Sequence, residues 1–242
     1  MDVWMQALTG SLHEPTAKRV RVVHGGLVIV DVDALEDDGR PLLSPSTPFA
    51  MHTMPGESLT VRTSVGDRPA AVFGPADPDF DGYVVLDFFS FDEWLEEDER
   101  IVGHPRDPFK RIDVRSSSRH VRIELDGQVL AESSRPMLVF ETGLPTRYYL
   151  PREDVRMDLL RPTSTRSCCA YKGAAAYWSL DLGDRTLEDL VWTYEAPLSD
   201  ARAVIDRVAF FNERVDIVID GARGDRPATE FTKTGWQDGT RR

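Results

Sequence analysis

Seven consecutive residues, Ser167 to Gly173, gather the side chains of this chain that are best suited to chemistry. Both cysteines of the protein lie here, together with one of its four lysines. Cys169, Tyr171 and Lys172 place a thiol, a phenol and an amine close together in the chain. Cysteine and lysine are the side chains that a protein tunes most readily into a nucleophile or a base near neutral pH. We therefore expect catalytic residues here: Cys169 as nucleophile or acid, Lys172 as base or electrostatic stabiliser, and Tyr171 as a third candidate.

Structural roles stay open for each of these side chains. A buried cysteine is most often a small apolar residue, and we expect this for Cys168. Tyr171 could equally pack in the core with its hydroxyl satisfied. Two adjacent cysteines do not form an ordinary disulfide, because the Cα atoms of the pair must lie at a defined separation. If a nearby cation lowers the pKa of Cys169, this thiol should react faster than Cys168.

Other polar and aromatic residues could complete a substrate pocket. Glu141 and Arg147 flank a predicted turn, and they are either an ion pair between two strands or the walls of a pocket that faces Lys172. Arginine binds carboxylate and phosphate groups through two parallel hydrogen bonds, so the second alternative predicts a small anionic ligand. The substrate-binding candidates are Glu141, Arg147, Tyr149, Trp192 and Tyr194.

Short strands must position these residues. Runs rich in β-branched and aromatic side chains, bounded by glycine, proline and aspartate, predict a mainly β fold. Residues 151–160 and 199–206 are predicted as short helices, since proline fits the first helical position and serine is a good N-cap. The strands predicted around the candidate site are 137–141, 147–150, 175–182, 190–194, 208–211 and 215–219.

Internal similarity predicts that the chain contains two copies of one fold. Three pairs of segments align without gaps and in the same order, which favours a duplication. The pairs are 20–31 with 121–132, 56–68 with 173–185, and 84–92 with 208–216. The first copy lacks counterparts of Cys169, Tyr171 and Lys172. We therefore expect two mainly β domains with short helices, of which the first is a degenerate copy that acts as scaffold.

This organisation divides the chain into a degenerate first copy, an acidic linker with prolines, a second copy with the Cys-Ala-Tyr-Lys-Gly site, and a polar tail. Their boundaries are 1–97, 98–112, 113–222 and 223–242. The carboxylates of 92–99 and His104 could hold a metal ion, but a solvated, self-repelling connector is the simpler interpretation. Cys-x-x-Cys pairs are absent from the sequence, which argues against zinc. We expect no metal and no cofactor.

The composition limits the partners and the compartment. A formal net charge of −12 argues against nucleic acid, because a phosphate-binding surface needs clustered positive charge. Apolar runs stay well short of the roughly 18–20 residues that cross a bilayer, and the first residues lack the pattern of a signal peptide. We expect a cytoplasmic protein whose partner is a small anionic molecule, without nucleic-acid or membrane binding. Self-association is left open.

Longer motifs in the second half resemble the domain of unknown function 427 family. The resemblance rests on the segments 135–155, 169–178, 192–197 and 210–216, and it covers nearly all of the second copy. The acidic linker is similar to that of tandem members with a degenerate first copy. The resemblance implies a small fold of the β-tent type and supplies no reaction. The sequence departs from the family pattern at Ala170, where proline is usual.

The family also has a nucleotidyltransferase-like name, which the residues of this chain do not support. Metal-dependent nucleotidyl transfer needs paired carboxylates to hold two cations. Asp31 and Asp33 form such a pair, but no Gly-Ser pair precedes them at a suitable distance, and they lie in the first copy. In the second copy the counterpart of this pair has one acid, Glu132.

These observations predict a small-molecule enzyme, of open reaction class, that acts on a small polar anion through Cys169 and Lys172. The alternative is a non-catalytic binding or interaction module that uses the same pocket. A turnover assay separates the two, because a binder gives saturable affinity and no product. A purely structural protein is the third alternative, favoured if the thiol and the amine are buried or diverge.

Overall fold

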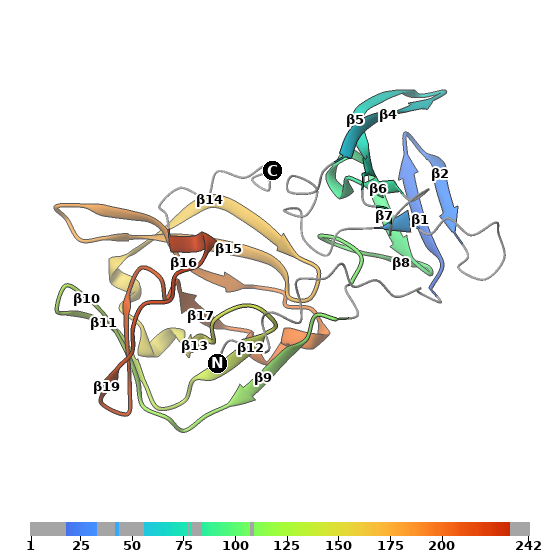
Figure 1. Cartoon of the computed structure of the whole chain (residues 1–242). Helices are drawn as coiled ribbons and strands as arrows, with labels where there is room; N and C mark the ends of the chain where they lie inside the picture. Colours follow the sequence, from blue (N-terminus) through green and yellow to red (C-terminus); the bar gives the residue numbers. More distant parts are fainter. Residues whose placement is uncertain are drawn as a thin grey trace. The chain divides into compact units, whose positions relative to one another are not determined.

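A computed structural model describes residues 18–32, 42–43, 56–76, 78, 84–106 and 109–232. The chain divides into two compact units, Met1–Phe109 and Lys110–Arg242, and the division falls inside the stretch 98–112. Both units are built from short strands (Figure 1), so the expected mainly β fold is confirmed. Asp33 and the segment 53–55, which aligns with the site loop, lie outside the described residues. In the described part of the chain, no helix is long and apolar enough to cross a membrane.

Seven strands form the larger sheet of the second unit, in the order β14-β15-β16-β17-β13-β12-β9. Each neighbouring pair is antiparallel. The strands are β9 (Ile112–Ser116), β12 (Met137–Glu141), β13 (Arg147–Pro151), β14 (Leu160–Cys169), β15 (Gly173–Asp181), β16 (Thr186–Tyr194) and β17 (Arg207–Phe210). The two long hairpin partners β14 and β15 make one edge of this sheet.

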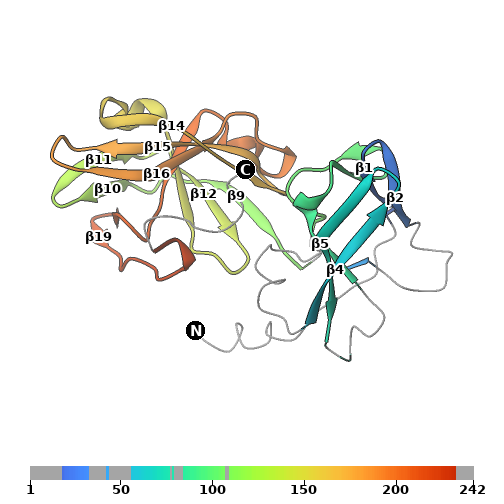
Figure 2. The ribbon, with the colours of Figure 1, turned by 90° about the horizontal axis from the view of Figure 1, so that it is seen from above.

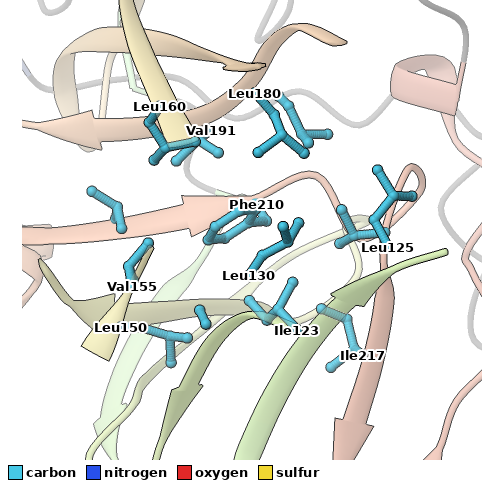
Figure 3. Packing of buried hydrophobic residues seen from close by; sticks show 14 of the residues in the cluster. Ile123, Leu125, Leu130, Leu150, Val155, Leu160, Leu180, Val191, Phe210 and Ile217 are labelled. Carbon is cyan, nitrogen blue, oxygen red and sulfur yellow. The ribbon is translucent and has the colours of Figure 1, made fainter. Parts of the chain in front are cut away.

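A four-stranded sheet of order β11-β10-β18-β19 packs against the larger sheet. Its strands are β10 (Val121–Leu125), β11 (Gln128–Ser133), β18 (Asp216–Ile219) and β19 (Ala222–Arg223). Figure 2 shows β10 and β11 lying against β15 and β16. Between the sheets, Ile123 and Leu130 meet Leu150 and Phe210 in one apolar core (Figure 3). Burial of side chains of this size contributes about 1.5–3 kcal/mol each, so this core stabilises the unit.

Side chains alternate between the two faces of the larger sheet. In β13, Leu150 joins the core under the small sheet, whereas Tyr149 belongs to a second cluster on the opposite face. In β16, Val191 and Trp192 divide in the same way. Successive residues of a strand point to opposite faces, so β13 and the second half of β16 are buried on both faces. The second cluster is aromatic, and the 3-10 helix η5 (Ser199–Val204) packs into it.

The two helices predicted in this unit form as 3-10 turns. Residues 151–160 contain η3 (Arg152–Asp154) and η4 (Met157–Leu159). Between them Val155 is extended and pairs with Ala131 of β11, so the backbone bonds of this segment go partly to the sheet and a continuous helix is interrupted. At η5 the N-cap residue is Leu198 rather than Ser199, and no side chain caps the turn.

The described residues of the first unit form two four-stranded sheets, of order β2-β1-β7-β8 and β3-β6-β5-β4. The strands are β1 (Val20–His24), β2 (Leu27–Val32), β3 (Leu42–Leu43), β4 (Gly56–Thr63), β5 (Gly66–Pro75), β6 (Val84–Leu86), β7 (Glu93–Glu96) and β8 (Glu99–Arg100). Most of the acidic stretch 92–99 therefore lies in the paired strands β7 and β8 and does not form a connector. Trp94 of β7 is buried, and Glu96 lies 2.8 Å from Lys18 Nζ.

Several features of the two units correspond. The β1–β2 hairpin has a register shift between Val22 and Val23, and the β10–β11 hairpin has one between Ile123 and Glu124, which align in sequence. The next strand to pair with the hairpin is β7 in one unit and β18 in the other. The orders β4-β5-β6 and β15-β16-β17 also agree. One difference is that β3 pairs with β6 in parallel, whereas β13 pairs with β17 in antiparallel fashion.

Candidate functional site

The loop 170–172 between β14 and β15 holds Lys172 in a fixed position. Cys169 and Gly173 close the hairpin as paired residues. Gly173 has a φ of +96°, which glycine adopts without strain, and a Cβ here would lie 3.3 Å from the carbonyl oxygen of Ala196. The backbone N–H of Leu198 donates to the carbonyl of Lys172 over 3.1 Å. The glycine that ends the site motif is therefore required by the shape of the loop.

Lys172 Nζ donates to Glu141 Oε2 in a buried ion pair. The two side chains are 10% and 5% exposed. Glu141 ends β12, which lies four strand spacings from β15 in the order of the sheet. In a flat sheet this would be about 19 Å, at roughly 4.8 Å per strand. The sheet must therefore curve around the aromatic cluster so that its distant strands meet at this ion pair.

A second lysine, Lys110, completes the cluster. Its Nζ lies 3.3 Å from Glu141 Oε1 and 5.9 Å from the centre of the Tyr171 ring. β9 and β12 pair Ile112 with Glu141, and Arg111 is bonded through its backbone to Thr142. These bonds hold Lys110 beside the carboxylate. Lys110 was not among the predicted site residues, although it is one of only four lysines. Strand pairing, and not sequence spacing, brings it close to Glu141.

We refer to Lys110, Glu141 and Lys172 as the lysine–glutamate triad. Burial alone would raise the pKa of Glu141, but the two lysines oppose it through charge and hydrogen bonding, so that the pKa is lowered overall. Glu141 is thus a carboxylate at neutral pH, and the formal charges of the triad sum to one positive charge. Tyr171 is buried beneath Lys110, and its ring packs against that ammonium.

Arg147 has a carboxylate partner other than Glu141. Its guanidinium donates to both oxygens of Glu213, over 2.7 and 2.8 Å. Burial raises the pKa of Glu213, whereas the hydrogen bonds from Arg147 and Thr229 lower it, with a net lowering. The rings of Trp192, Phe211 and Phe231 surround the guanidinium at 5.6–5.7 Å. Arg147 was expected either to pair with Glu141 or to line a pocket that faces Lys172. The structure shows neither, because both carboxylate oxygens of Glu213 accept from its guanidinium.

The remaining candidates, Tyr149, Trp192 and Tyr194, form the aromatic cluster between the triad and the Arg147–Glu213 pair. Trp192 Nε1 donates to the Tyr149 hydroxyl over 2.9 Å. Burial raises the pKa of both tyrosines well above the usual value, and the charge of Glu141 adds to this effect. They are therefore neutral hydroxyl groups at any pH of interest. The charges of Glu141 and Arg147 both act on the pKa of Tyr149, so its hydroxyl lies near both side chains.

The two cysteines lie on opposite sides of β14. Cys168 is exposed, which corrects its expected place in the core, and Cys169 packs half-buried against the aromatic cluster. Cys168 and Cys169 have opposite exposure because adjacent residues of a strand point to opposite faces. Burial and the neighbouring Cys169 raise the pKa of the Cys168 thiol. Both thiols are free. Across the described residues, three or more His, Cys, Asp or Glu side chains do not gather in a possible metal site.

The geometry defines the second unit as a curved, mainly β domain that encloses a charged triad and an aromatic cluster. Residues 113–221 match a family model described as Domain of unknown function (DUF427). The match includes Glu141, Arg147, Cys169 and Lys172 and begins after Lys110. A comparison with curated proteins gave no match.

Proposed function

We propose that the second unit binds a small polar anion at the lysine–glutamate triad and acts on it as an enzyme. The supporting observation is that two lysines share one nearly buried carboxylate, which leaves an excess positive charge. The chain as a whole has a formal net charge of −12. A local positive centre in such a protein is suited to attract and orient an anion.

The burial of Lys172 favours the purely structural alternative, but stability alone does not explain why the triad is present. Removing charges from water costs several kcal/mol per ion, and apolar residues of similar size are often as stabilising as a buried ion pair. Within the part of the chain that the structure describes, the ion pairs of both ammonium groups are made with this one carboxylate, and each ammonium has three N–H donors. An incoming oxyanion can accept from them without displacing Glu141.

The residues of the site suit proton transfer to or from a bound anion. Lys172 is the proposed acid or base, and Glu141 orients its ammonium group through their hydrogen bond. Cys169 ends β14 beside the loop and is the candidate nucleophile or second acid, while Tyr171 supports Lys110. Arg147 is neutralised by Glu213, so its proposed role is to shape the aromatic cluster with Tyr149, not to bind substrate directly.

The test is a screen of small carboxylates and phosphates by thermal shift, followed by NMR of each stabilising compound for product. Lys172→Met should weaken binding by roughly ten- to a hundredfold, the effect of losing one charged hydrogen bond. Lys18→Met is the matched control, because Lys18 pairs with Glu96 on the surface of the first unit. If no anion stabilises the protein, or if Lys172→Met responds as the wild type does, the proposal fails.

A non-catalytic binding module is the second candidate. It is favoured by the closed pairing of Arg147 with Glu213 and of both lysines with Glu141, which leaves no strongly activated nucleophile at the site. Saturable binding that depends on Lys172, without product from any bound compound, would establish it in place of the enzyme.

We further propose that the first unit is a degenerate copy of the second and that each has a β-tent fold. The shared strand orders and the two bulges at aligned positions support this. In both units an arginine of the aligned Gly-Asp-Arg triplet reaches the neighbouring hairpin tip: Arg68 Nη2 lies 3.3 Å from His24 Nδ1, and Arg185 pairs with Asp126.

A further inference from the structure

Lys110 enters the site from outside the segment that matches the family. The match begins at residue 113, whereas Lys110 lies two residues before β9. Its backbone neighbours are nevertheless tied to the site: Thr142 N donates to the carbonyl of Arg111 over 3.1 Å, and Arg111 N donates to Thr142 Oγ1 over 3.0 Å. The hydrogen bonds of Arg111 with Thr142 therefore fix the position of Lys110 in this chain.

The two lysines contact different oxygens of the same Glu141 carboxylate, which brings both ammonium groups to one site. Their side chains differ in access to solvent, at 19% exposed for Lys110 and 10% for Lys172. Lys110 is thus the cation that an approaching ligand meets first. The contact with the Tyr171 ring holds it in place without using an N–H donor.

The charge of the triad limits the charge of the ligand. Two ammonium groups and one carboxylate sum to +1, and the buried Arg147–Glu213 pair sums to zero. A singly charged anion brings the site to neutrality. A dianion leaves an unpaired negative charge beside Glu141, where little water is available to solvate it, and burial of an unpaired charge is strongly unfavourable.

We infer that Lys110 and Lys172 act together as a two-point anchor for a carboxylate group, and that Lys110 sets a preference for monoanions over dianions. This inference rests on the proposed function of the triad. It adds a specificity-determining residue and names the substrate class, a small carboxylic acid in its anionic form.

Lysine signals in the wild-type protein provide the first test. The chain has four lysines, so ¹³C-labelled lysine gives few signals to assign. At about pH 8 acetate is a monoanion, and methyl phosphate is mostly a dianion. Acetate should shift the Cε signals of both Lys110 and Lys172, leave Lys18 unchanged, and bind at least roughly tenfold more tightly than methyl phosphate. Equal binding of the two probes, or an unmoved Lys110 signal, would overturn the inference.

Variants separate this inference from the proposal on which it rests. Lys110→Met should weaken acetate binding roughly ten- to a hundredfold, Lys110→Arg should retain most of it, and Lys18→Met should bind as the wild type does. If Lys172→Met abolishes binding and Lys110→Met leaves it intact, the anion site stands and the role of Lys110 is refuted. If neither probe binds the wild type, the inference about Lys110 fails, and the wider screen of carboxylates and phosphates decides whether the triad binds an anion. Should Lys110→Met not fold, the wild-type lysine signals and Lys110→Arg still decide the question.

Discussion

Glu141 shows why the residue types of a site can be found in a sequence while their pairing cannot. The sequence pointed to Glu141 and Lys172, and the structure joins them. It also pointed to Arg147, which the structure assigns to Glu213, a residue present in the motif but given no role. From the sequence alone, a lysine and an arginine are equally suitable ion-pair partners for the carboxylate of Glu141. The curvature of the sheet decides between them.

Glu141→Gln should destabilise the protein by about 3–5 kcal/mol, because it leaves two lysines beside a neutral amide in a poorly solvated place. Chemical denaturation measures the change. Glu195→Gln, at an exposed position, is the control and should stay within about 0.5 kcal/mol of the wild type. A similar small effect at Glu141 would show that the ion pairs of the triad contribute little to folding.

The same carboxylate should make part of the stability depend on pH. Its pKa in the folded protein is below the usual value of 4.5, so the unfolded chain binds this proton more readily. The contribution of Glu141 is therefore fully present above about pH 4.5 and is lost as the pH falls through the lowered folded value. The difference in unfolding free energy between wild type and Glu141→Gln, measured from neutral to acid pH, isolates this contribution. A difference that grows toward acid pH would contradict the assignment.

The thiols should label in the opposite order to the one that the sequence favoured. Cys168 is exposed and Cys169 packs against aromatic rings, so access should give Cys168 the faster reaction even though its pKa is raised. Iodoacetamide labelling of Cys168→Ser and Cys169→Ser, read by mass spectrometry above neutral pH, compares each thiol alone. Faster labelling of Cys169 would point to an activated thiolate and restore it as the leading nucleophile.

At the scale of elements, the sequence predicted strands best where apolar residues alternate. β12 and β13 were found within a residue of their observed ends. β14 was missed, since its alternate residues are exposed polar side chains and it contains Pro162. Proline is tolerated in an edge strand, and β14 is an edge with a register shift after Pro162. A polar edge strand gives no apolar pattern to detect.

The turn η6 (Glu230–Thr232), which follows the second sheet, should contribute to stability. Thr229 Oγ1 donates to Glu213 over 2.5 Å, and the Phe231 ring packs on Phe211 and Arg147. Phe231→Ala should therefore cost about 1–3 kcal/mol, within the usual range for lost packing. Calorimetry of this variant beside Phe140→Ala, which removes a ring that is 43% exposed, provides the comparison. Equal melting temperatures for the two variants would mean that the turn does not cover the Arg147–Glu213 pair in solution.

At the scale of the molecule, the duplication is a prediction about ancestry that geometry can test. An experimental structure should allow β1, β2, β4, β5 and β7 to superpose on β10, β11, β15, β16 and β18 in one operation. Arg68 should then fall on Arg185, because both belong to the aligned triplet and both reach a hairpin tip. Strand paths that require separate superpositions would end the idea of two copies and leave two unrelated β units.

The position of Lys110 before the matched segment affects how ligand preferences can be compared between proteins that share that segment. A matched segment that starts at residue 113 contains the aromatic cluster and one lysine of the triad, yet it stops short of the second. Two proteins could therefore agree along the whole matched segment and still prefer ligands of different charge, if one lacks a cation in the preceding residues. Substrates of relatives should be compared only after the residues that pair with the start of β9 have been aligned. If Lys110 selects the ligand as proposed, exchange of a short leading segment would change ligand choice and leave the rest of the domain as it is.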